Sequence, residues 1–113
     1  MPSPARFRST FATITSPPAD LARAAVVHKA LADPTRLRIL ERLASGDGSV
    51  GDLMRHVDLS QPLVSWHLRR LRAAGLVQTR RSGREVICSL SRDALRRFHD
   101  DEHAMLGLVG HGS

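Results

Sequence analysis

The sequence holds a single cysteine, Cys88, and no apolar run close to the roughly 18 residues of a membrane-spanning helix. One cysteine cannot form a disulfide within the chain, which agrees with a reducing compartment. The N-terminal stretch lacks the apolar segment and cleavage site of a secretory signal peptide. We therefore expect a cytoplasmic protein with one main folded domain and no membrane segment.

Acidic residues are absent between Leu59 and Arg84, whereas six arginines fall in that stretch. Its charge of +6 equals the net charge of the whole chain, in which Lys29 is the single lysine. Arginine grips phosphate bidentately and reads guanine better than lysine does. The arginine content alone is equally consistent with a coding bias, but its clustering is typical of a nucleic-acid-binding surface.

Capping residues and apolar spacing predict four successive helices. The first opens at Pro17-Pro18, and the second is capped by Asp33 and extends to Ala44. A short third helix is predicted over 50–57. A fourth is predicted over 61–74, where Gly75 stops it.

The rest of the chain is predicted to form a β-hairpin and a last helix. Strand-like segments at 76–80 and 85–89 flank a Ser82-Gly83 turn. Ser91 caps a helix that is predicted to run from Arg92 to about Val109. This order predicts a mainly α protein with a small β-hairpin, which is the winged helix-turn-helix (ααααββα).

Two parts of the chain are distinguished by composition. We expect a flexible N-terminal arm over 1–16, with a short helix near 7–14, because that stretch has no clear period. The DNA-binding and dimerisation domain is then expected over 17–113.

The fourth predicted helix has two unlike faces. Its apolar stripe consists of Val64, Leu68 and Leu71. Its opposite face consists of Pro62, Ser65, Trp66 and Arg69. A recognition helix needs this division, because one side anchors in the domain while the other enters the major groove. The alternative is the solvated face of an ordinary surface helix, but an exposed tryptophan is uncommon on such a face.

We predict DNA contacts from this helix and from the hairpin, which would act as the wing. Arg69 is a candidate for guanine or phosphate, and Trp66 for a thymine methyl or a sugar. The hairpin arginines are suited to the minor groove or the backbone. The full predicted set is Ser60, Gln61, Pro62, Ser65, Trp66, Arg69, Arg80, Arg81 and Arg84.

Three segments together resemble the ArsR/SmtB family of bacterial repressors. They are LADPTRLRILERL (31–43), LSQPLVSWHLRRLRAAGLV (59–77) and RRSGREV (80–86). The resemblance implies a homodimer joined through the first and last helices, bound to a palindromic DNA operator and released by an effector, often a metal ion. It also implies DNA contacts at the positions of Gln61, Pro62, Ser65 and Trp66. The residues assigned to the dimer interface are Leu21, Ala25, His28, Leu95, Phe98 and Leu106.

The metal sites known in this family are not reproduced in this sequence. The segment that matches the family's Cys-Val-Cys-Asp-Leu is 49–53, which contains no sulfur. In the register of the last helix, the family's Asp and His fall at Arg92 and Ala94, and the later ligands at Met105 and Leu108. None of these four is a usual zinc ligand.

Other candidate sensors remain open. His99 and His103, spaced i, i+4, can chelate zinc or nickel, with Asp100, Glu102, His28 and His111 as possible additions. The alternative is that the pair are polar residues beside the dimer contact. Cys88 is interpreted as a half-buried strand residue, with redox sensing as the alternative. His67 is interpreted as a packed or hydrogen-bonded histidine.

An enzyme is not expected, because the chain has no Gly-rich phosphate loop, no nucleophile elbow and no convincing acid/base pair. The sequence therefore favours a transcriptional repressor that needs no cofactor. The alternative is a winged-helix module that binds protein instead of DNA.

Overall fold

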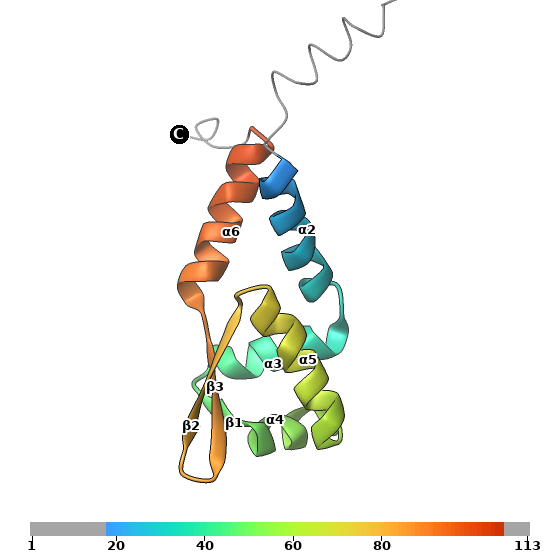
Figure 1. Cartoon of the computed structure of the whole chain (residues 1–113), viewed down its shortest axis with the longest axis vertical. Helices are drawn as coiled ribbons and strands as arrows, with labels where there is room; N and C mark the ends of the chain where they lie inside the picture. Colours follow the sequence, from blue (N-terminus) through green and yellow to red (C-terminus); the bar gives the residue numbers. More distant parts are fainter. Residues whose placement is uncertain (1–17, 108–113) are drawn as a thin grey trace, which may run out of the picture.

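A computed structural model describes residues 18–107. The elements in that range appear in Figure 1, in the order α2 (Pro18–Leu31), α3 (Pro34–Ala44), β1 (Gly48–Ser49), α4 (Val50–Val57), α5 (Gln61–Ala73), β2 (Val77–Ser82), β3 (Glu85–Leu90) and α6 (Arg92–Met105). The predicted order of helices and hairpin is confirmed. The predicted arm over 1–16, with its short helix, lies outside the described residues.

Helix starts are fixed by side chains that satisfy the first backbone N–H groups. The Asp33 carboxylate accepts a hydrogen bond of 3.0 Å from the Arg36 backbone N–H, with Pro34 in the first turn. The Ser91 hydroxyl accepts one from the Ala94 N–H in the same way. Both predicted caps are therefore confirmed.

Helix α4 begins with a reciprocal pair of capping bonds that the sequence analysis did not anticipate. The Ser49 hydroxyl accepts from the Asp52 N–H at 3.0 Å, and the Asp52 carboxylate accepts from the Ser49 N–H at 2.9 Å. Hydrogen bonds from Ser49 to the Asp52 carboxylate lower the pKa of that carboxyl, and the bond from the Ser49 backbone has the largest effect.

The structure differs from the prediction in the hairpin, the sheet and the last helix. Strand β2 runs over Val77–Ser82, and Ser82 pairs with Glu85, so the predicted Ser82-Gly83 turn is wrong by one residue and the turn is Gly83-Arg84. The sheet has a third strand, β1, whose Gly48 and Ser49 pair with Cys88 and Ile87 on β3, giving the order β1-β3-β2. Two residues are too few to show an alternating pattern. Helix α6 ends at Met105, because Gly107 takes a left-handed conformation at φ +72°, so its extension to Val109 is wrong.

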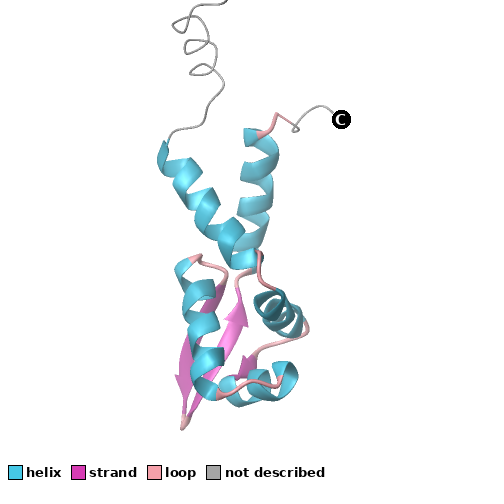
Figure 2. Ribbon diagram, turned by 90° about the vertical axis from the view of Figure 1, so that its right-hand side faces the viewer, coloured by secondary structure: helices cyan, strands magenta, loops and turns pink. Residues whose placement is uncertain are grey.

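The core lies where α3, α4 and α5 pack together with the sheet. Its largest fully buried side chains are Ile39, Leu43, Leu53, Val64, Leu71, Leu76 and Cys88. Helices α2 and α6 project from this core at one end (Figures 1 and 2). The hairpin turn and the N-terminal end of α5 lie at the opposite end. Among residues 18–107, no helix has the length and apolar character that would let it cross a membrane.

Candidate nucleic-acid interface

A tight turn sets α5 against α4. Asp58 ends α4 in the left-handed conformation at φ 54°, which aspartate tolerates better than most residues. The Leu59 N–H then donates to the Met54 carbonyl at 3.3 Å, so the chain reverses within a few residues. Ser60 occupies the N-cap of α5 and its side chain makes no capping hydrogen bond. Its exposed hydroxyl is therefore not committed to the helix start.

The two faces predicted for α5 are confirmed. The apolar stripe of Val64, Leu68 and Leu71 is buried. On the other side, Gln61, Pro62, Trp66 and Arg69 are exposed and Ser65 is half-buried. The helix thus presents one polar and cationic surface while the other surface anchors it in the core.

The hairpin brings three further cations to this end of the molecule. Arg80, Arg81 and Arg84 are exposed around a turn in which Gly83 has φ +62°. Arg80 lies 3.7 Å from the carboxylate of Asp47, and such a surface pair contributes little stability. Arg84 and Gln61 line one shallow hollow, so the wing and the start of α5 lie beside each other.

His67 is buried on α5 and is hydrogen-bonded, as predicted. Its Nδ1 lies 3.3 Å from a guanidinium nitrogen of Arg36, which acts as the donor, and 3.8 Å from the carboxylate of Asp33. Burial lowers the pKa of His67 below its ordinary value; the Asp33 carboxylate opposes this shift and Arg36 adds to it. The imidazole is therefore held neutral, with its proton on Nε2.

The depressed pKa of His67 predicts an acid-sensitive fold. The unfolded chain takes up this proton at higher pH than the folded chain does, so the free energy of unfolding falls as pH drops below about 6.5. We expect urea midpoints at pH 7.5 and 5.5 to differ more in the wild type than in His67→Asn, whose side-chain Oδ1 takes the position of the imidazole Nδ1 and accepts the same bond without titrating. Equal pH dependence of both proteins would contradict this assignment.

Arg36 was missed in the sequence analysis, and it connects three helices. Its guanidinium donates to the carbonyls of Ala30 at 2.8 Å and Lys29 at 3.1 Å, at the C-terminal end of α2. The same group, carried on α3, contacts His67 on α5. A cation is favoured beside the last carbonyls of a helix. The place of Arg36 in the sequence, three residues after the Asp33 cap, does not indicate these distant contacts.

Trp66 is 42% exposed, and the guanidinium groups of two arginines lie over its ring. The guanidinium carbon of Arg70 is 4.7 Å from its ring centroid, and that of Arg36 is 5.7 Å away. The His67 ring meets it edge-on at 5.0 Å. Arg70 was not among the predicted DNA contacts.

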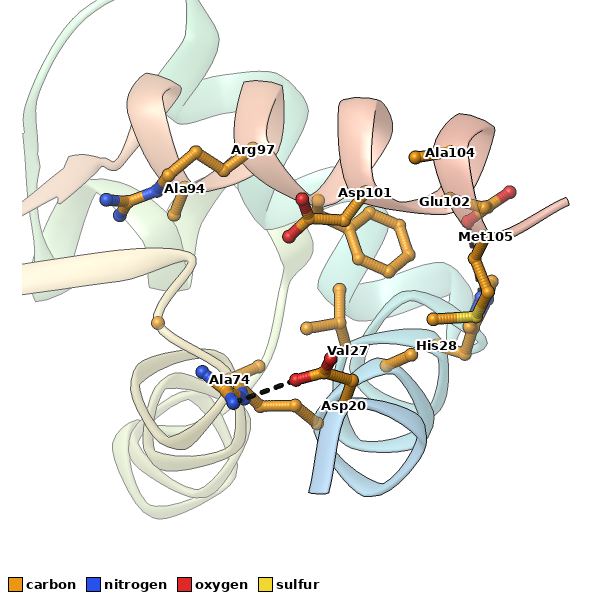
Figure 3. A pocket seen from close by; sticks show the side chains of 14 residues that line it. Asp20, Val27, His28, Ala74, Ala94, Arg97, Asp101, Glu102, Ala104 and Met105 are labelled. Atoms are coloured by element: carbon orange, nitrogen blue, oxygen red, sulfur yellow. Dashed lines mark hydrogen bonds and ion pairs between the residues drawn. The ribbon is translucent and has the colours of Figure 1, made fainter. Parts of the chain in front are cut away.

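Helices α2 and α6 lie at the other end of the molecule (Figure 1), and Figure 3 shows the side chains that line the hollow between them. Of the predicted interface residues, Leu21, Ala25 and His28 are exposed on α2, and Leu106 is exposed just past the end of α6. Leu95 and Phe98 are half-buried and pack against the core. The predicted set of six thus consists of four exposed residues and two that flank the core.

His28 is held between two side chains of α6. Its ring meets Phe98 at 5.0 Å, and its Nε2 lies 3.2 Å from the carboxylate of Glu102. Val26, which the sequence analysis did not assign to the interface, is also exposed on α2. These contacts tie α2 to α6 within one protomer.

The candidate metal ligands are only partly brought together. The rings of His99 and His103 lie 4.2 Å apart on α6, as their spacing predicts. Across residues 18–107, no group of three or more His, Cys, Asp or Glu side chains is arranged to hold a metal ion, and His111 lies outside the described range. Arg92, at the family's ligand position, donates instead to the Ala44 carbonyl at 2.6 Å.

Cys88 was interpreted as half-buried, which is wrong: it is fully buried on the central strand β3, where its side chain packs into the core. Burial raises the pKa of its thiol, with Arg72 opposing the shift, so the reactive thiolate is disfavoured. We expect the native protein to react with a thiol-specific chromogenic disulfide far more slowly than the urea-unfolded chain. Rapid reaction of the folded protein would instead support the redox alternative.

The order of the elements, the tight α4–α5 turn and the basic hairpin find a counterpart in known proteins. Residues 33–79 match the sequence pattern of the family described as "Bacterial regulatory protein, arsR family". Transcriptional repressor SdpR of Bacillus subtilis is 36% identical over 86 residues, which cover 76% of this chain and 92% of that protein. The chain belongs to the ArsR family.

Further relatives and solved structures show the same likeness. Transcriptional activator HlyU of Vibrio cholerae is 44% identical over 70 residues, or 62% of this chain and 65% of that protein. A homodimeric winged helix-turn-helix DNA-binding domain from Mycobacterium bovis has a TM-score of 0.66 at 32% identity. It covers 76% of this chain and 81% of that one. The winged helix-turn-helix prediction is therefore confirmed, and the chain is a DNA-binding transcriptional regulator of a family whose members are not enzymes.

Proposed function

We propose that two copies of this chain form a homodimer that binds a palindromic operator and represses transcription by occluding the promoter. The observation that carries the proposal is the exposed, cationic face of α5 beside the basic hairpin, at the end opposite α2 and α6. DNA contacts are assigned to the residues predicted above: Ser60, Gln61, Pro62, Ser65, Trp66, Arg69, Arg80, Arg81 and Arg84. This activity places the protein in the cytoplasm, with the DNA.

The dimer would form through α2 and α6. Leu21 and Val26 on α2, and Leu106 just past the end of α6, are 40%, 46% and 63% exposed, which is a high exposure for large apolar side chains. The related Mycobacterium bovis domain is homodimeric. A two-fold dimer presents two recognition helices to half-sites about one helical turn apart, which a palindromic operator requires.

Titration of a fluorescent duplex from the gene's own promoter at two salt concentrations tests DNA binding. A dimer that neutralises several phosphates shows a steep fall in affinity as salt increases. Absence of binding at low salt would favour the protein-interaction alternative. Sedimentation of the free protein tests the dimer, because a monomer would remove the two-fold operator model.

We assign repression as the effect on transcription, because a protein can block a promoter simply by occupying it. Relatives include both a named repressor and a named activator, so direction must be measured. Transcription in vitro from the mapped promoter should fall when purified protein is added. A rise would show activation, and the occlusion mechanism would be wrong.

Release by an effector is the remaining part of the proposal. The His99/His103 pair supplies two ligands, whereas zinc in proteins is usually four-coordinate, so two copies of the pair would be needed. Elemental analysis of the dimer, followed by operator titration with Zn²⁺, Ni²⁺ and a thiol oxidant, tests metal and redox release together. Release by Zn²⁺ or Ni²⁺ that is lost in His99→Ala would support the pair.

A further inference from the structure

The stacking of Arg70 on Trp66 is a feature of α5 that the predicted role of Trp66 in reading bases does not explain. The two residues are one turn apart, and the Arg70 guanidinium lies over the exposed indole at 4.7 Å. Among residues 18–107, no carboxylate lies within ion-pair distance of Arg70. Within the described residues its guanidinium thus stacks on the indole ring, and no carboxylate there compensates its charge.

We propose that Arg70 contacts a DNA phosphate and that Trp66 positions the Arg70 side chain. This proposal rests on the DNA-binding function proposed above. Trp66 then acts through Arg70 instead of reading a base. The partner is the DNA backbone of either strand, so this contact adds affinity for any sequence.

The position of Arg70 on α5 favours phosphate over a base edge. At 100° per residue, Arg70 lies about 100° around the helix from Arg69 and about 140° from Ser65. It is therefore on the flank of the face that enters the groove, where the phosphates run. Helical side chains lean toward the N-terminus, so stacking carries the Arg70 charge one turn closer to the DNA-facing end of α5.

The guanidinium of Arg36, which also lies beside Trp66, is already hydrogen-bonded within the protein. Arg36 donates to Ala30, Lys29 and His67, so its guanidinium is committed to joining α2 to α5. Arg36, 5.7 Å from the indole centroid, and the His67 ring at 5.0 Å also contact Trp66, and these contacts restrict the ring so that it can serve as a platform. A fixed platform reduces the rotamer freedom that a flexible arginine loses when it binds phosphate.

The test compares Trp66→Ala, Trp66→Phe, Arg70→Ala and the Trp66→Ala/Arg70→Ala double variant, with Arg96→Ala, exposed on α6 at the other end of the molecule, as the matched control for the loss of one charge. Affinity is measured for the operator and for an unrelated duplex of equal length, across a salt series. We expect Arg70→Ala to reduce the salt slope by about 2 per dimer, one for each copy. Trp66→Ala should lower affinity for both duplexes by a similar factor, and the double variant should resemble Arg70→Ala. Trp66→Phe keeps an aromatic face and should bind nearly as the wild type does.

Trp66 is the chain's single tryptophan, so its fluorescence reports the contact directly. In the free protein, acrylamide should quench Trp66 more strongly in Arg70→Ala than in Arg96→Ala. This readout does not depend on DNA, and Trp66→Phe and Arg70→Ala carry the test if Trp66→Ala fails to fold.

Two outcomes would overturn this proposal while leaving DNA binding in place. One is an unchanged salt slope in Arg70→Ala when the wild type shows a steep one. The other is a Trp66→Ala effect that is confined to the operator and additive with Arg70→Ala, which would make Trp66 a base reader. A wild type that binds neither duplex would instead overturn the proposed function itself.

Discussion

Replacing Arg69 or Arg84 by alanine is expected to weaken operator binding by about tenfold or more while leaving the dimer intact, since one specific arginine contact is worth roughly 1–3 kcal/mol. Each substitution removes two contacts from a dimer. Arg69 is exposed on the groove-facing side of α5, and Arg84 is exposed beside Gln61 at the hairpin turn. The expected losses are measured by titration of the mapped operator at fixed salt.

Arg96→Ala is the matched control for these two variants. Arg96 is also exposed, but it lies on α6, which projects from the opposite end of the molecule. Its loss removes the same charge with little effect on affinity. Normal operator binding by both Arg69→Ala and Arg84→Ala would show that the assigned surface is wrong, provided sedimentation shows intact dimers.

Leu71→Ala is expected to destabilise the fold by about 2–5 kcal/mol, the usual cost of truncating a fully buried leucine. Leu71 is 0% exposed and anchors α5 in the core. Leu63→Ala, on the same helix at 49% exposure, is the control and should cost less than about 1 kcal/mol. Urea unfolding at one fixed protein concentration compares the variants, because a dimer's stability depends on concentration. Equal losses at both positions would contradict the assignment of faces.

Local chemistry explains why so much of the fold was predictable. The caps at Asp33 and Ser91 act within one turn, and the apolar stripe of α5 follows the helical repeat. Each signal is contained in a short window of sequence. The hairpin was predicted for the same reason, since its turn residues lie between the two strands.

Features that depend on distant partners were not predictable from spacing. Strand β1 exists because two residues pair with β3 about forty positions later. Arg36 and the Trp66–Arg70 stack draw their roles from side-chain positions in space, which the sequence pattern does not encode. The end of α6 was misplaced because apolar spacing continues past Gly107, whose left-handed backbone ends the helix.

Mapping the DNA-bound surface residue by residue tests directly whether α5 and the hairpin contact the operator. Backbone amide signals of the labelled protein are followed by NMR as the operator duplex is added. The largest shifts are expected in residues 60–70 and in the hairpin turn at 82–84, with small changes at the far ends of α2 and α6. Shifts concentrated on α2 and α6, with α5 unaffected, would contradict the assigned DNA-binding surface.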